Sequence, residues 1–209
     1  MRKILDLDNW NRKEHFLFFK QMQEPFFGAN VTIDCTKAYD KAKSLGTSFF
    51  IYYLHKTLVA VNAFESFKYR MENTHIYIYD RIDGSATISR ADGTFGFSLI
   101  EYHPDYSIFE QNAIAEINRI QSTTGLFTRE FNDDNLIHFS AIPWLNFSSL
   151  SHARNMTFPD SSPKISFGKM TVSKKGKRKM SMSIHVHHGL MDAIHVGQMV
   201  DYFQEIMNQ

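Results

Sequence analysis

The run KMSMSIHVHH, from Lys179 to His188, alternates apolar and polar side chains and therefore predicts a half-buried β-strand. One face carries Met180, Met182, Ile184, Val186 and His188, and the other carries Ser181, Ser183, His185 and His187. His188 thus shares the face of the core residues. An imidazole in a dry site can serve as a general base near neutral pH, which makes His188 a candidate functional residue.

The rest of the chain places this strand in a mixed domain. Further strands are predicted over 30–35, 74–80, 85–89, 94–101, 135–141 and 165–173, with a turn at Asp83-Gly84. Helices are predicted over a short segment that follows Asn9, from 37 to about 44 behind an N-cap at Thr36, and over 49–64, 106–121 and 193–209. Because there is no regular βαβ alternation and no Pro/Gly-rich linker, residues 1–209 are expected to form a single α+β domain.

The composition excludes several classes of protein. The 209 residues include 43% hydrophobic and 22% charged residues, and the formal charge of +1 gives no overall field that favours nucleic acid or a membrane surface. The 19 Phe and 9 Tyr must line a core, a pocket or a subunit interface. A single cysteine, Cys35, and the lack of an apolar run near the roughly 20 residues of a membrane span predict a cytoplasmic protein.

Two patterns have ordinary and functional interpretations. The basic run 174–179 is interpreted as a solvated hairpin turn around Gly176 rather than a nucleic-acid patch. His185 and His187 are spaced as zinc ligands can be, and His195 and Asp192 are the candidate further ligands. No pattern of acidic ligands accompanies them, so the expectation is that no metal is bound.

His188 and Asp192 form a sharper constellation. His188 ends the predicted strand just before the turn that leads to Asp192, and strand-end side chains often meet a ligand. Asp192 could orient the imidazole directly, or it could hold the loop through an arginine. Spacing alone leaves a structural and a catalytic role for His188 equally open.

Three segments then resemble one family. The segment HVHHGLMDAIHVG, residues 185–197, resembles the signature of the chloramphenicol acetyltransferases and, more distantly, of the acyl-CoA transferases that share a His-x-x-x-Asp motif. The segments NWNRKEHF (9–16) and FSAIPWLNFSS (139–149) match in order and spacing, and FKYRM (67–71) and Thr94-Phe95 are also similar. The resemblance spans essentially the whole chain.

The resemblance implies a fold, an assembly and a reaction. It implies a two-layer α/β sandwich with a mixed β-sheet packed by helices, and a homotrimer with its active sites at the subunit interfaces. His188 of one subunit would be the general base for direct acetyl transfer from acetyl-CoA to a hydroxyl of a small acceptor such as chloramphenicol, with no metal and no acyl-enzyme. A hydroxyl is a poor nucleophile until a base takes its proton.

The resemblance also assigns supporting roles. Ser140 matches the serine that donates to the oxyanion near acetyl-CoA, and one such donor can be worth about 3–4 kcal/mol of barrier. Ser166 stands where a threonine is usual and keeps its hydroxyl. Asp192 would pair with Arg12 and fix the loop that positions the base. Lys169 matches a lysine near the CoA phosphate, whereas a second lysine expected near Ser48 is absent.

The acceptor pocket departs from the family more than the catalytic residues do. Phe18, Phe95 and Phe127 are kept as aromatic walls, but Phe19 replaces a tyrosine and His152 replaces an apolar residue. Ala193 also replaces the usual glycine after Asp192. Three hypotheses therefore stay open: acetylation of chloramphenicol, the same chemistry on another hydroxylated acceptor, and a non-catalytic ligand-binding relative or a histidine-metal protein.

Overall fold

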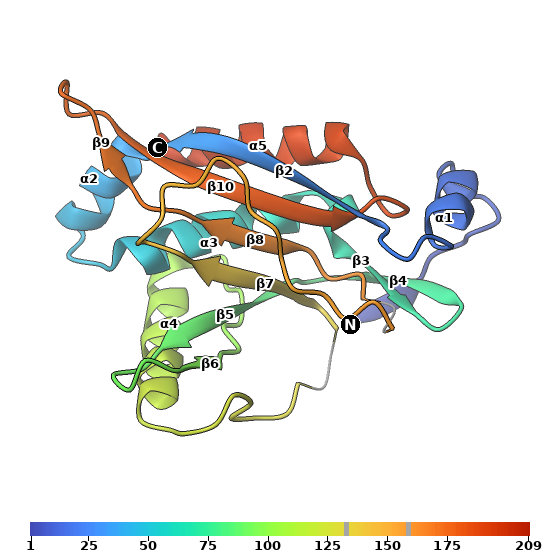
Figure 1. Ribbon diagram of the computed structural model, residues 1–209, viewed down its shortest axis with the longest axis horizontal. Helices are drawn as coiled ribbons and strands as arrows, with labels where there is room; N and C mark the ends of the chain where they lie inside the picture. Colours follow the sequence, from blue (N-terminus) through green and yellow to red (C-terminus); the bar gives the residue numbers. More distant parts are fainter. Residues whose placement is uncertain (132–133, 158–159) are drawn as a thin grey trace.

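The computed structural model describes residues 1–131, 134–157 and 160–209, and it contains one large and one small β-sheet (Figure 1). The large sheet has the strand order β2-β10-β8-β7-β5-β6, with β9 beside β10. Its strands are β2 Phe26–Asp34, β5 Asp83–Ser89, β6 Phe95–Phe97, β7 Leu136–Ala141, β8 Lys164–Phe167, β9 Thr171–Val172 and β10 Arg178–His187. The small sheet has the order β1-β4-β3 and consists of β1 Arg2–Ile4, β3 Tyr69–Glu72 and β4 His75–Tyr79.

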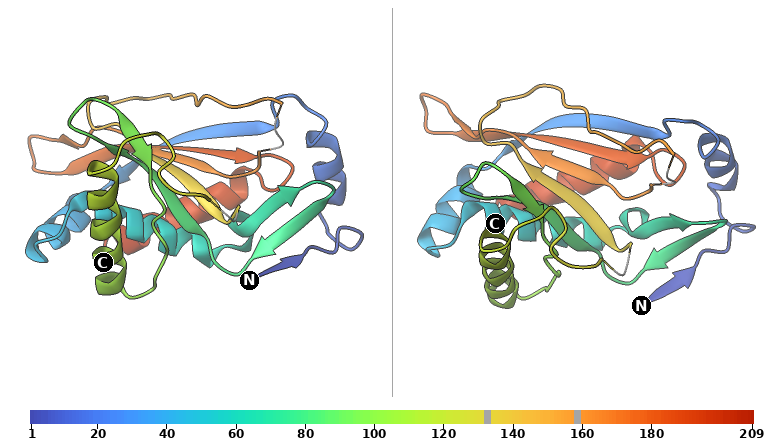
Figure 2. Two further views of the ribbon diagram at one scale, coloured as in Figure 1. Left: turned by 90° about the horizontal axis from the view of Figure 1, so that it is seen from below. Right: turned by 60° about the horizontal axis from the view of Figure 1, so that its bottom comes forward.

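Most of the helices cover one face of the large sheet (Figure 2). The helices are α1 Lys13–Phe19, α2 Thr36–Ser44, α3 Phe49–Ala63, the 3₁₀ helix η1 Glu65–Lys68, α4 Tyr106–Gln121 and α5 Ala193–Met207. Helices α2, α3, α4 and α5 cover that face, and α1 lies beyond one end of the sheet. Leu54 and Leu58 of α3 are fully buried beneath the sheet. No helix in the described part of the chain is long and apolar enough to cross a membrane.

The sheet is mixed, as the sequence predicts. Strand β7 runs parallel to both β5 and β8, whereas β10 is antiparallel to β2 and β8. Apolar side chains such as Ile137, Phe139 and Ile184 point into the core that the helices close. The opposite face is polar, and the connection from β7 to β8 passes over it (Figure 2).

Several predicted boundaries are wrong for tertiary reasons. Asp83-Gly84 is not a turn but the start of β5, because the buried Asp83 carboxylate accepts the N–H of Tyr102 at 2.7 Å. The predicted strand 94–101 is regular only over Phe95–Phe97. The predicted strand 165–173 is interrupted at Gly168, whose N–H donates to Ser181, and continues as β9.

The N-terminal boundaries of two elements also differ. Strand β2 starts at Phe26 rather than residue 30, because β10 pairs with it along its whole length. The N-cap of α2 is Cys35 rather than Thr36, whose N–H donates to Asp34 at 2.9 Å. The sequence also gives no indication of β1, β3 and η1.

Candidate active site

Helix α1 and the end of β10 hold the first group of predicted site residues. Arg12 stands at the N-cap of α1 and Phe19 at its last turn, and both contact the segment that follows β10. The Arg12 guanidinium donates to Asp192 Oδ2 at 2.8 Å and to the carbonyl oxygen of His188 at 3.1 Å. The predicted pairing of Arg12 with Asp192 is thereby confirmed.

Asp192 has two structural duties. Its carboxylate caps α5 by accepting the N–H of Ile194 at 3.1 Å, while its other oxygen binds Arg12. Desolvation opposes ionisation of this carboxyl, but the hydrogen bonds from Arg12 and Ile194 outweigh it and hold the pKa of Asp192 below its ordinary value. Asp192 therefore fixes the loop as an anion, and no contact with the His188 ring is needed.

The imidazole of His188 is held between aromatic rings. Phe19 stacks on it at a centroid distance of 4.0 Å, and Phe27 lies tilted against it at 4.7 Å. Its backbone N–H donates to the carbonyl of Pro25 at 2.8 Å. Nδ1 of this ring is buried and has no hydrogen-bond partner among residues 1–131, 134–157 and 160–209. His188 is thus fixed by its backbone and by stacking on Phe19.

The second group of predicted residues lies on the polar face of the large sheet. Register pairs Ser140 of β7 with Ser166 of β8, and Ser166 with Ser183 of β10. We call these three residues the serine row. Ser166 and Ser183 are fully buried, so their hydroxyls lie in a low-dielectric environment where a hydrogen bond is stronger than in water.

A parallel row of larger side chains lies one step along the same strands. Register pairs Ser85 with His138, His138 with Lys164, Lys164 with His185, and His185 with Gly28. We call His138, Lys164 and His185 the imidazole row. A Cβ on Gly28 would lie 2.4 Å from His185 Nε2, so only glycine leaves room for this ring.

His152 joins the two rows from the connection between β7 and β8. Its Nε2 lies 3.5 Å from Ser166 Oγ, and its ring packs edge-on against His185 at 4.7 Å. Burial, and secondarily the neighbouring His185, lowers the pKa of His152 to about 4. Burial likewise lowers the pKa of His138 to about 4. Both rings are therefore neutral at physiological pH.

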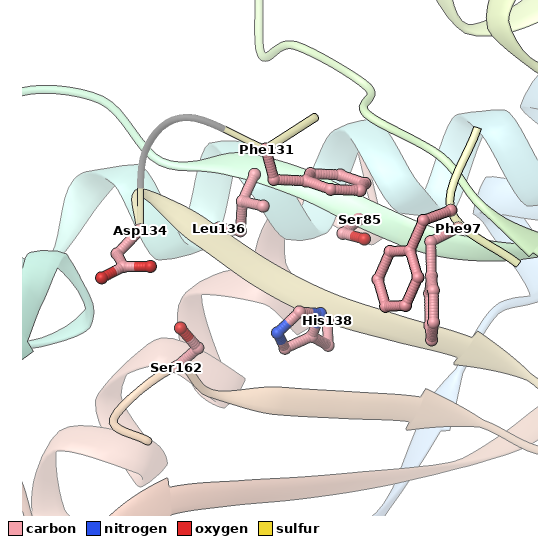
Figure 3. Close-up of a pocket in the computed structure, with 8 residues that line it drawn as sticks. Ser85, Phe97, Phe131, Asp134, Leu136, His138 and Ser162 are labelled. Atoms are coloured by element: carbon pink, nitrogen blue, oxygen red, sulfur yellow. The ribbon is translucent and has the colours of Figure 1, made fainter. Parts of the chain in front are cut away.

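These residues line two adjoining pockets. A cavity of about 400 Å³ is bounded by Ser140 and Ser166 together with Phe95, Phe97, His138 and His152. A second pocket of about 260 Å³ shares Ser85, Phe97 and His138 with it and extends to Phe127 and Leu136 (Figure 3). Figure 3 shows the His138 ring on the β7 strand, between Ser162 and Phe97, where it lines this pocket.

The two groups of residues do not meet within one chain. Ser183 of the serine row precedes His188 by five residues, which is about 17 Å along an extended strand. Phe18 and Phe19 belong with His188, whereas Phe95, Phe127 and His152 belong with the serine row. Lys169 is exposed just beyond β8, and its N–H donates to Leu145 at 2.7 Å.

The sequence did not predict that the three side chains of the imidazole row are neighbours. The alternation of β7 puts His138 in phase with Ser140, but the pairing with Lys164 and His185 depends on strand order. His187 lies on the polar face, as predicted, yet it is buried, and its Nδ1 accepts the N–H of Gly189 at 3.0 Å. The described residues contain no group of three or more His, Cys, Asp or Glu side chains arranged to hold a metal ion.

Comparison with known proteins gives one consistent family. The family model described as chloramphenicol acetyltransferase matches residues 2–204. Chloramphenicol acetyltransferase 3 of Escherichia coli is 27% identical over 206 residues, which cover 97% of this chain and 95% of that protein. Chloramphenicol acetyltransferase of Proteus mirabilis is 27% identical over 209 residues, covering 99% and 94%.

Solved structures agree with this result. A chloramphenicol acetyltransferase structure superimposes with a TM-score of 0.89 at 29% identity, covering 99% of this chain and 100% of the other. The dihydrolipoamide acetyltransferase of Azotobacter vinelandii superimposes with a TM-score of 0.67 at 8% identity, covering 94% and 86%. At that identity the second likeness shows a common fold alone.

Proposed function

The chain belongs to the chloramphenicol acetyltransferase family, and from that premise we propose that it transfers the acetyl group of acetyl-CoA to a hydroxyl of a small acceptor such as chloramphenicol. The observation that carries this proposal is the fixed loop of His188. Arg12 binds both the Asp192 carboxylate and the His188 carbonyl, so the imidazole is oriented without losing either ring nitrogen to Asp192. This is the arrangement that a general base requires.

The reaction needs one base and one oxyanion donor. The His188 imidazole takes the proton of the acceptor hydroxyl. At the same time the oxygen of that hydroxyl bonds to the carbonyl carbon of the thioester. The resulting tetrahedral oxyanion accepts a hydrogen bond from Ser140, and the Ser166 hydroxyl holds a water molecule beside the intermediate. Collapse breaks the C–S bond, and the imidazolium returns its proton to the departing thiolate of CoA. No acyl-enzyme is formed, because both substrates are bound together.

The distance between base and donor supports an assembly of several chains. About 17 Å of strand separates His188 from the serine row, which is too far for one hydroxyl to meet both His188 and Ser140. We propose that a second copy supplies His188 to this pocket, in a homotrimer with three equivalent sites. The exposed Phe18 and Phe127 then contribute to acceptor walls at the interface, and Lys169 meets the CoA phosphate.

An acetyl-transfer assay tests the proposal. Purified protein, acetyl-CoA and chloramphenicol are expected to release free CoA thiol, and His188→Ala is expected to lower kcat/KM about 10²- to 10⁴-fold. His75→Ala, at the exposed first residue of β4, is the matched control and should change nothing.

Three results would point elsewhere. Unchanged activity of His188→Ala would refute the role of this base. If other hydroxylated acceptors were acetylated and chloramphenicol were not, the proposed reaction would stand and chloramphenicol would be excluded as the acceptor. Calorimetric binding of acetyl-CoA and acceptor without any thiol release would indicate a non-catalytic relative.

A further inference from the structure

We propose that His138 and His152 select a neutral polyol as the acceptor, one whose reacting hydroxyl has a further hydroxyl on either side and whose ring presents one flat apolar face. The inference rests on the proposed function, because it concerns the acceptor half of the same site. The observation behind it is that two imidazoles border the serine row, His138 along β7 and His152 from the connection between β7 and β8.

The position of His138 follows from the strand that carries it. His138 and Ser140 lie on the same face of β7, two residues apart and thus about 7 Å apart along the strand. The part of the chain that the structure describes gives the His138 ring no hydrogen bond, and the ring lines both pockets. An acceptor whose oxygen sits at Ser140 would place its neighbouring groups over this ring.

The position of His152 follows from two contacts. Its Nε2 meets Ser166 Oγ at 3.5 Å, and its ring is braced by the edge-on packing against His185 at 4.7 Å. Ser166 in turn is paired with Ser140 across neighbouring strands. His152 therefore borders the serine row on the side of the connection between β7 and β8, whereas His138 borders it along β7.

The charges that line the larger cavity favour an uncharged acceptor, whereas the smaller pocket also carries the Asp134 carboxylate. Lys164 is the one lysine that lines the larger cavity, and its ammonium is already bound to the Asp160 carboxylate. The nearby Arg154 is bound to Glu24. Because both of these cations have a partner, a charged acceptor in the larger cavity would lose its hydration without gaining a counter-ion.

The aromatic wall provides for the apolar face of the acceptor. Phe95 and Phe97 meet edge to face at 5.6 Å, and Phe97 and Phe127 lie 5.3 Å apart. The exposed fractions of Phe95 and Phe127 are 43% and 68%, so their rings are open to a ligand. A ring polyol can lay its C–H face on such a wall while its hydroxyls reach the imidazoles.

The imidazoles discriminate by what they leave unpaired. A neutral imidazole has one donor and one acceptor nitrogen, and both can bind hydroxyl groups. An acceptor that covers these nitrogens with apolar atoms displaces their water molecules and offers no hydrogen bond in return. The unpaired nitrogens then lower the affinity for that acceptor more than the hydroxyl contacts raise it for a polyol. The apolar side of the pocket is the aromatic wall, and the polar side is formed by His138 and His152.

Competing acceptors test this inference. The probes are phenyl β-D-glucopyranoside and chloramphenicol, and the readout is the ratio of their kcat/KM values for thiol release from acetyl-CoA. The wild-type protein should prefer the glucoside. His138→Leu and His152→Leu should each shift the ratio at least about tenfold toward chloramphenicol. His75→Leu, on an exposed hairpin, is the matched control and should leave the ratio unchanged.

Conservative variants separate selection from folding. His138→Asn and His152→Gln keep a hydrogen-bonding group and should hold the ratio within about threefold of wild type. A wild-type preference for chloramphenicol would overturn the inference even if the leucine variants failed to fold, and so would a ratio that His152→Leu and His138→Leu leave unchanged. If neither probe is acetylated but the protein turns over a charged acceptor, the inference fails and the proposed chemistry stands. If nothing is acetylated, both fail.

Discussion

The division of the site between two chains can be tested by mixing inactive subunits. His188→Ala removes the proposed base and leaves the serine row intact, and Ser140→Ala does the reverse. Within one chain His188 lies about 17 Å along the strand from Ser183, the member of the serine row on β10, so the two defects should fall in different halves of each site. A subunit with only the first defect can then complete a neighbour that has only the second.

The expected magnitude follows from the composition of the mixed trimers. Ser140→Ala alone should cost about 10²- to 10³-fold in kcat, and His188→Ala about 10²- to 10⁴-fold. In a closed ring with head-to-tail contacts, a site is intact when its base comes from the Ser140→Ala chain and its pocket from the His188→Ala chain. Every mixed trimer, whether 2:1 or 1:2, then holds one such site in three, so mixed trimers should recover about a third of wild-type activity.

The assay is thiol release by mixed oligomers. The two variants carry different affinity tags, are unfolded and refolded together, and are purified through both tags so that only mixed assemblies are measured. Doubly purified protein that is no more active than its parents would refute the shared site. A parental mixture that was never unfolded is the control and should stay inactive.

Three further predictions concern the loop, the glycine and the buried histidine. Asp192→Ala should lower stability by about 1–3 kcal/mol in urea unfolding, because it removes the α5 cap and the partner of Arg12; Asp192→Asn should retain the cap and lose only the ion pair. Gly28→Ala should lower the free energy of unfolding by about 1–3 kcal/mol, because the new methyl group displaces the His185 ring. In a double-mutant cycle, the same substitution in a His185→Ala background should lower it much less. Burial, followed by the charge of a nearby arginine, lowers the pKa of His187 to about 4, and burial lowers the pKa values of His138 and His152 to about 4 as well. The unfolded chain therefore binds more protons below pH 6.5, and the free energy of unfolding should fall as pH drops from 6.5 to 4, with His187 contributing on the order of 3 kcal/mol. His187→Asn should remove its share of that slope while the other two histidines keep theirs, and an unchanged slope would contradict the assignment.

The faces of the sheet could be predicted because strand periodicity is local. Alternation alone puts Met182 and Ile184 in the core and Ser183 on the opposite face, and the structure confirms both sides. The same pattern puts Ser140 in phase with His138 on β7. The α5 helix is also predicted nearly to its ends, because its apolar stripe and its Asp192 cap lie within the segment itself.

The rows of the site could not be predicted because they depend on which strands are neighbours. Ser140, Ser166 and Ser183 become adjacent only through the order β7-β8-β10, which no local pattern encodes. Arg12 and Asp192 lie at opposite ends of the chain, and their pairing was implied by family resemblance rather than by spacing. Asp83-Gly84 has the composition of a turn, but a long-range hydrogen bond to Tyr102 makes it a strand.

The placement of β10 has a consequence for biosynthesis. This strand is the last of the chain, yet it lies between β2 and β8 in the sheet. Until it leaves the ribosome, both neighbours expose unpaired edges, a state in which nascent chains aggregate. A product that terminates before Arg178 would keep those open edges and would also lack His188. Completion of the large sheet and acquisition of His188, the proposed base, therefore occur together in synthesis.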